Sequence, residues 1–96
     1  MYTVTEAQAL LPAGAVLLAF APGAQGFATQ AHGFVLYRHP HAVGDFKVHT
    51  VHFETQGLVS GGYHSNANDA WMDWFNRVEL SAHYVLHGTP LSGEPQ

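Results

Sequence analysis

The stretch that decides the fold is residues 65–79, which read SNANDAWMDWFNRVE. Its apolar side chains recur at helical i, i+4, i+7, i+8 and i+11 spacing and include both tryptophans of the chain: Ala67, Trp71, Trp74, Phe75 and Val78. Asn66 suits a helix N-cap, and the Asp69 carboxylate lies near the positive end of the helix. Asp73 and Arg77 form an i, i+4 pair that we assign to the solvent side. The pattern predicts an amphipathic helix over about residues 67–79 with its tryptophans packed inward.

The composition of the chain limits the classes of function. The 96 residues suit one domain, and no cysteine is available for a disulfide, a thiolate metal site or a thiol nucleophile. Only 10% of the residues are charged, against a usual share of about 25%, which suggests that another copy or another protein covers some of the surface. Three cations against seven acids cannot neutralise the phosphates of a nucleic acid or bind an anionic membrane.

No targeting or membrane segment is predicted. The first basic residue is Arg38, so no charged region precedes the apolar run Ala13–Ala21. That run is also far shorter than the roughly 20 residues of a membrane helix. We therefore expect a cytoplasmic single domain over residues 1–96, with a frayed tail at 88–96 that carries Pro90, Gly93 and Pro95.

The first half of the chain predicts a short helix and two strands. Thr5 and Gln8 have the spacing of a capping box, which would open a helix that ends near Leu11. The runs 15–21 and 34–37 are apolar on both faces, as expected of central strands. Residues 22–33 between them form a long and nearly uncharged loop.

The next strand, predicted over residues 46–55, leaves two arrangements open. Side chains alternate along a strand, so Phe46 and Val48 point one way and Val51 and Phe53 the other. A bulge near residues 49–50 would place all four on one face; otherwise both faces of the strand are partly covered.

The remaining segments complete a predicted sheet. Residues 58–65 form a strand with a bulge or a close backbone approach at Gly61 and Gly62, and residues 81–87 alternate like a last strand. Short connections favour a meander of the first four strands. We therefore predict the α+β class: an antiparallel sheet of four to five strands, one amphipathic helix on one face and a short N-terminal helix.

Histidine is the one overused residue type, with eight in the chain. A transition-metal site needs three or four converging ligands, and no motif with that spacing is present. His49 and His52 lie on opposite faces of a regular strand, so they share an ion only if a bulge intervenes. If a metal site exists, its candidate ligands are His49, His52 and His64. The prediction is that the histidines are structural, with no metal and no cofactor.

Enzymatic motifs are also missing from the sequence. Ser60-Gly61-Gly62 lacks the nucleophile elbow of a hydrolase, and Gly23–Gly26 lacks the lysine of a phosphate-binding loop. We expect no catalytic residues and no enzyme activity.

Aromatic side chains outside the helix suit a binding surface, because such side chains are enriched among interface anchors. The candidate binding residues are Phe27, Tyr37, Tyr63 and Arg38. The first hypothesis is a protein-binding module that can also form a homodimer. By analogy of class alone, it suits accessory or inhibitor proteins of phages and mobile elements, including anti-CRISPR proteins. The alternative is a histidine-based metal-binding or hydrolytic site.

Overall fold

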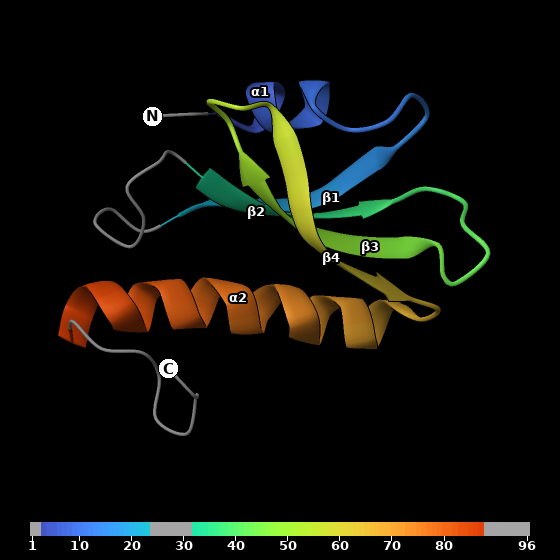
Figure 1. Ribbon diagram of the computed structural model, residues 1–96. Coiled ribbons are helices and arrows are strands. Elements are labelled where there is room, and N and C mark those ends of the chain that lie inside the picture. Colours follow the sequence, from blue (N-terminus) through green and yellow to red (C-terminus); the bar gives the residue numbers. More distant parts are fainter. Residues whose placement is uncertain (1–2, 24–31, 88–96) are drawn as a thin grey trace.

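A four-stranded antiparallel sheet forms the centre of the protein. The computed structural model describes residues 3–23 and 32–87, with side chains up to residue 81. The elements follow the order α1 (Val4–Ala9), β1 (Val16–Pro22), β2 (His32–Arg38), β3 (Phe46–His52), β4 (Gly57–His64) and α2 (Ala67–His87). The strands pair in the order β1-β2-β3-β4, which confirms both the α+β class and the predicted meander (Figure 1).

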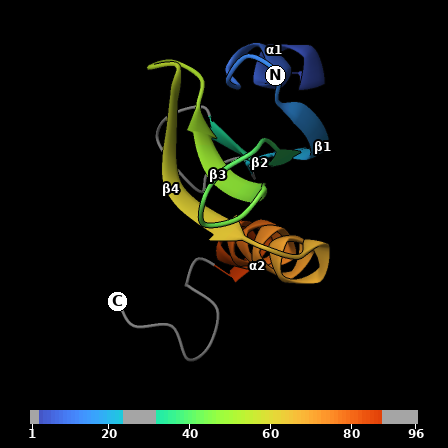
Figure 2. The ribbon, with the colours of Figure 1, turned by 90° about the vertical axis from the view of Figure 1, so that its right-hand side faces the viewer.

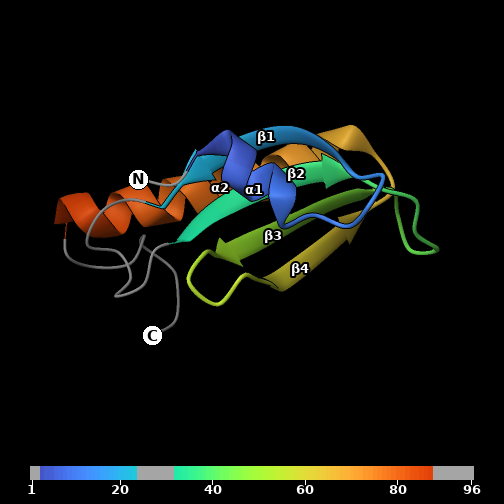
Figure 3. The same ribbon diagram turned by 90° about the horizontal axis from the view of Figure 1, so that it is seen from above.

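The two helices lie on opposite faces of this sheet (Figures 1 and 2). Seen from above, α1 lies over β1 and β2 and leaves β3 and β4 free of helix on that side (Figure 3). The longer helix α2 crosses the other face and contacts β2, β3 and β4. We call these the α1 face and the α2 face of the sheet.

Helix α2 begins as the sequence predicts and ends later. Asn66 Oδ1 accepts a hydrogen bond from the Asp69 backbone N–H, and Asn66 Nδ2 donates to Asp69 Oδ2, both at 2.9 Å. The helix continues to His87, so the predicted strand over residues 81–87 is wrong. Ser81, 1% exposed, follows Ala70 and Trp74 at i+11 and i+7 and thus continues the buried helical stripe. The sequence holds no glycine or proline that would stop the helix before Gly88.

The buried stripe of α2 includes both tryptophans but is rotated from the predicted one. Trp71 and Trp74 pack against the buried cluster of Leu36, Val48 and Ala70, as expected. The Trp74 indole donates to the Phe34 carbonyl at 3.1 Å. Phe75, predicted to face inward, is instead exposed. The helix therefore presents the small Ala70, rather than Phe75, at its closest approach to the sheet.

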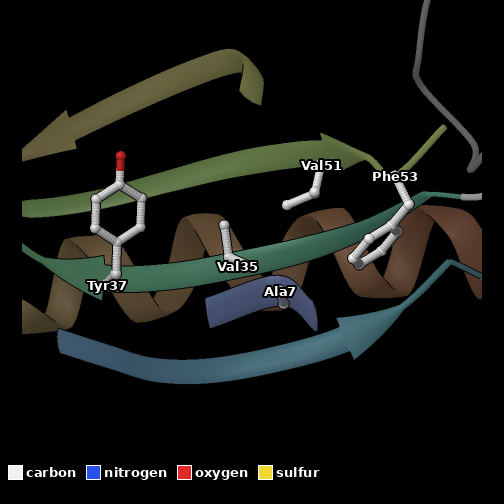
Figure 4. Close-up of a cluster of buried hydrophobic side chains, with 5 residues drawn as sticks. All are labelled: Ala7, Val35, Tyr37, Val51 and Phe53. Atoms are coloured by element: carbon white, nitrogen blue, oxygen red, sulfur yellow. The ribbon is translucent and has the colours of Figure 1, made fainter. Parts of the chain in front are cut away.

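The α1 face has its own buried cluster, drawn in Figure 4: Ala7, Val35, Tyr37, Val51 and Phe53. Phe46 packs with Val48 on the α2 face, so β3 is covered on both faces. The sequence left two arrangements open for this strand, a bulge near residues 49–50 or coverage of both faces, and the structure has coverage of both faces. The bulge lies on β4, where Ser60 and Gly61 together oppose the single residue His49, and Ser60 has a positive φ of 54°.

Strand β1 is an edge strand, so its predicted central position is wrong. Its apolar residues are two-sided because α1 lies over one face, while Ala19 on the other packs against the cluster of Leu36, Val48 and Ala70. A bulge at Leu18 interrupts the regular pairing of this strand. The Gln8 side chain occupies part of its edge, where Leu17 N–H donates to Gln8 Oε1 and Gln8 Nε2 donates to the Ala15 carbonyl, both at 3.3 Å.

The start of α1 differs from the predicted capping box by two residues. The cap is Thr3, whose hydroxyl accepts from the Glu6 N–H while the Glu6 carboxylate accepts from the Thr3 N–H. Gln8 was expected to belong to the capping box. Its side chain instead hydrogen-bonds to the backbone of β1.

Candidate functional site

One end of the α1 face carries a cluster of imidazole, phenol and ammonium groups. Alternate residues of β2, β3 and β4 point to this face, which places Tyr37, Lys47, His49 and Tyr63 together. Two histidines of the β2–β3 connection add to them, and we call the whole group the imidazole–phenol cluster: Tyr37, His39, His41, Lys47, His49 and Tyr63.

Tyr37 and His49 form its interior. The Tyr37 ring extends from β2 toward β4 (Figure 4), stacks on the His49 ring with centroids 5.7 Å apart, and its hydroxyl lies 3.2 Å from His49 Nδ1. Burial lowers the pKa of His49, and the charges of Arg77 and Lys47 lower it further. Burial, with a smaller effect from Tyr63, raises the pKa of Tyr37 to about 12. Both side chains are therefore neutral at pH 7.

Lys47 supplies the ammonium group of the cluster. The residue is buried, with 6% of its surface exposed. Its Nζ lies 3.4 Å from His39 Nδ1 and 5.4 Å from the centroid of the Tyr63 ring. His39 Nε2 lies 3.1 Å from the Ala13 carbonyl, which can only accept, so Nε2 carries the proton and Nδ1 accepts from Lys47. Across residues 3–23 and 32–81, no carboxylate lies within ion-pair distance of this ammonium.

Both ring nitrogens of His49 are enclosed by other groups. His49 Nδ1 is engaged by Tyr37, and a Cβ placed on Gly61 would lie 2.5 Å from His49 Nε2, so backbone closes off the second nitrogen. No serine, threonine or cysteine hydrogen-bonds to His49 within the described chain. The groups that remain include hydrogen-bond donors and one cation, which can hold a polar or anionic ligand.

The structure brings together two of the four predicted binding residues. Tyr37 and Tyr63 both flank His49, with the Tyr63 ring 5.9 Å from it. Tyr37 is 2% exposed, however, and cannot anchor a partner at the surface, whereas Tyr63 is exposed. Arg38 alternates to the other face of the sheet and is exposed there. Phe27 lies outside the described residues.

The three histidines named as candidate ligands do not converge. His49 lies on the α1 face, while His52 and His64 alternate to the α2 face. Among the residues that the structure describes, no three histidine, cysteine or acidic side chains are grouped as a metal site requires.

His64 instead belongs to an ionic network beneath α2. Its Nε2 lies 2.8 Å from Asp73 Oδ2, Arg77 Nε donates to Asp73 Oδ1 at 2.8 Å, and an Arg77 guanidinium nitrogen lies 3.4 Å from Thr50 Oγ1. The pair Asp73–Arg77 therefore faces the sheet, and its predicted place on the solvent side is wrong. Burial would raise the pKa of Asp73, but the hydrogen bonds and charges of Arg77 and His64 outweigh it and lower that pKa.

The outward side of α2 carries an apolar surface, which we call the α2 outer patch: Trp71, Met72 and Phe75. Met72 is 61% and Phe75 55% exposed, and the rings of Trp71 and Phe75 contact each other with centroids 5.8 Å apart. The helical spacing predicts Phe75 on the inward stripe, so this patch is not evident from that pattern. The i, i+3 spacing of Met72 and Phe75 between the polar residues Asn68 and Glu79 was the available signal.

An open groove of about 440 Å³ lies between α1 and β1. Val4, Gln8, Leu17, Leu18 and Phe20 line it, and Val4 and Leu18 are exposed. The Gln8 side chain already hydrogen-bonds to the backbone at its rim. Phe20 is the one aromatic residue among those that line this groove, whereas the α2 outer patch has two.

Comparisons with protein-family models, with curated protein sequences and with solved structures find no significant match. Within the described part of the chain, no helix combines the length and the apolar character that crossing a membrane requires. The candidate site is therefore interpreted from its own chemistry.

Proposed function

We propose that this protein is a non-enzymatic binding module that recognises another protein through the α2 outer patch. The observation that supports this most directly is the exposure of Met72 and Phe75 at the middle of the longest helix. Their neighbour Trp71 is half-buried and holds Phe75 by ring contact, so the patch is partly preorganised. Tryptophan, phenylalanine and methionine are enriched at the centres of protein interfaces.

Recognition by side chains, rather than by strand addition, fits the edges of the sheet. An exposed edge strand can pair with a foreign strand through its free backbone groups. Here β1 has a bulge at Leu18 and β4 a bulge at Ser60–Gly61, and Gln8 occupies part of the β1 edge. These features oppose strand addition, which favours the helix as the recognition surface.

The charge around the patch defines the chemistry of the partner. Asp69 and Glu79 are exposed on α2, whereas the guanidinium of Arg77 is engaged by Asp73 beneath the helix. A second copy docked on this patch would bring acidic groups near one another. A partner whose apolar side chains are flanked by lysine or arginine would instead be attracted, so we expect a basic, apolar protein surface as the occupant.

The biological role that we propose is that of an accessory or inhibitor protein of a phage or mobile element, of the anti-CRISPR type. What supports this role is the class of the domain: small, free of cysteine and acidic, with no grouped catalytic or metal-binding residues in its described part. A stoichiometric inhibitor needs a recognition surface and no catalytic site, and the α2 outer patch would be that surface.

The test is affinity capture from a lysate of the native host with matched variants. Phe75→Ala removes an exposed anchor from the patch, and Val43→Ala, at a residue 64% exposed in the β2–β3 connection, is the control. We expect the wild type and the control to retain the same protein, and Phe75→Ala to lose it by at least about tenfold, as for an interface anchor. Equal retention by all three proteins would contradict the proposal.

A salt series completes the experiment. If basic groups of the partner face Asp69 and Glu79, capture weakens as the ionic strength rises, because exposed charges are screened. Light scattering after size exclusion shows whether the captured complex contains one copy of this chain. A homodimer that persists in Phe75→Ala would place self-association on another surface.

A further inference from the structure

The imidazole–phenol cluster has unused hydrogen-bond donors around one buried cation. An ammonium group has three N–H donors, and the structure gives Lys47 one acceptor, His39 Nδ1, at 3.4 Å. The Tyr63 ring adds a cation–π contact. Taking a charge out of water costs several kcal/mol unless an opposite charge or several hydrogen bonds offset it. The described residues supply no carboxylate to this ammonium.

A second donor, His41, contacts the same Tyr63 ring that Lys47 approaches. The His41 ring contacts the Tyr63 ring with centroids 4.6 Å apart. His41 Nδ1 accepts the backbone N–H of Val43 at 3.0 Å, so in the neutral ring the proton is on Nε2. His41 is exposed, and this N–H can donate to a ligand. The donor groups of buried Lys47 and exposed His41 thus both lie near the ring of Tyr63, which is itself exposed and carries a third donor.

From this arrangement we infer that the Lys47 end of the imidazole–phenol cluster binds a small oxyanion, such as a phosphate, sulfate or carboxylate group. An oxyanion there supplies the counter-charge that Lys47 lacks and accepts charge-assisted hydrogen bonds from Lys47 and His41. Asp45, an acidic residue two positions before Lys47, is exposed. Its carboxylate accepts a hydrogen bond from the His41 backbone N–H at 3.3 Å. It holds the loop and makes no ion pair with Lys47.

This inference is independent of the α2 outer patch. The cluster lies on the α1 face, while the patch lies on a helix that packs on the opposite face (Figure 2). Loss of one binding activity in a variant therefore need not affect the other. The anion can be free in solution or belong to a side chain or terminus of another molecule, and the same donors would recognise it.

The test is a titration of the full chain followed by NMR of the histidine and tyrosine rings. Sodium phosphate, sulfate and acetate are compared with sodium chloride at equal ionic strength and constant pH. We expect saturable shifts for His41 and Tyr63 with the oxyanions but not with chloride. Acetate alone would identify a carboxylate source, and phosphate or sulfate a tetrahedral one.

Two variants locate the site. Lys47→Met keeps the length of the side chain and removes its charge, so the affinity for phosphate should fall by at least about tenfold, the value of one charge-assisted hydrogen bond. Arg38→Met removes one positive charge from an exposed residue of the other face and should leave the affinity unchanged. Equal losses in both variants would mean general electrostatic attraction and would overturn the inference.

A further variant covers the case in which Lys47→Met fails to fold. His41→Ala removes the exposed donor without touching a buried residue, and it should weaken phosphate binding severalfold. Shifts that grow linearly with concentration, or that chloride reproduces in the wild type, would overturn the inference without any variant.

Discussion

Trp74 and Phe75 are adjacent aromatic residues with opposite environments, and replacing each by alanine should give very different losses of stability. Trp74 packs on the cluster of Leu36, Val48 and Ala70, and its indole donates to the Phe34 carbonyl. Phe75 is 55% exposed and contacts mainly the rings of the two tryptophans. The rotation of α2 on the sheet, which differs from the one that the sequence predicts, sets this difference.

The expected magnitudes follow from burial. For Trp74→Ala, the lost packing costs about 3 kcal/mol, the low end for a large aromatic residue because Trp74 is only half-buried. The lost hydrogen bond adds about 1 kcal/mol. Phe75→Ala should cost about 1 kcal/mol, since roughly half of its surface is already in water. The difference of about 3 kcal/mol corresponds to about 12–24 °C in melting temperature for a domain of this size.

The assay is thermal and urea unfolding followed by far-UV circular dichroism, because tryptophan fluorescence changes when an indole is removed. Trp74→Phe serves as an intermediate variant that keeps an aromatic ring and loses the N–H donor, and it should cost about 1–2 kcal/mol. Equal destabilisation by Trp74→Ala and Phe75→Ala would refute the rotation of α2 described here. It would return Phe75 to the core and remove the basis of the α2 outer patch.

Three further perturbations probe the sheet and its polar groups. Gly61→Ala should destabilise the protein by roughly 1–3 kcal/mol in urea unfolding, because its Cβ would lie 2.5 Å from His49 Nε2, whereas Gly57→Ala, with no atom nearer than 3.6 Å, should fold normally. Asp73→Asn should cost roughly 1–3 kcal/mol through its hydrogen bonds with His64 and Arg77, and a cost near zero would show that the network is dispensable. The pKa of His49 is lowered in the folded state, so the unfolded chain binds more protons and stability should decrease as the pH falls below about 6.5. A pH series of unfolding curves should show this slope reduced in His49→Gln, and an unchanged slope would assign it to other histidines.

The candidate site shows where prediction from sequence stopped. The sequence indicates Tyr37 and Tyr63 as aromatic residues outside the helix, and both lie beside His49. Their common neighbours Lys47 and His49 come from a third strand, and only the register of β2, β3 and β4 reveals that all four share one face. Strand register depends on long-range pairing and on the bulge in β4, which local patterns do not specify.

Local sequence determined the elements whose causes are local. Asn66 and the spacing of Trp71 and Trp74 determined a helix with its cap and its apolar side, and short turns determined the meander of four strands. Alternation over residues 81–87 suggested a strand, but the backbone remains helical there because Ser81 continues a stripe already packed on the sheet.

Tertiary structure decided which surfaces are covered. The two-sided apolar run of β1 is compatible with a central or an edge position, and the strand is an edge because it pairs with β2 alone. Its apolar side chains pack against the buried clusters of both faces. Asp73 and Arg77 can face the sheet because His64 and Thr50 contact them there, while Phe75 is left outside. The physical reason is that a period in the sequence specifies that a face is apolar, whereas burial depends on which partner surface that face meets.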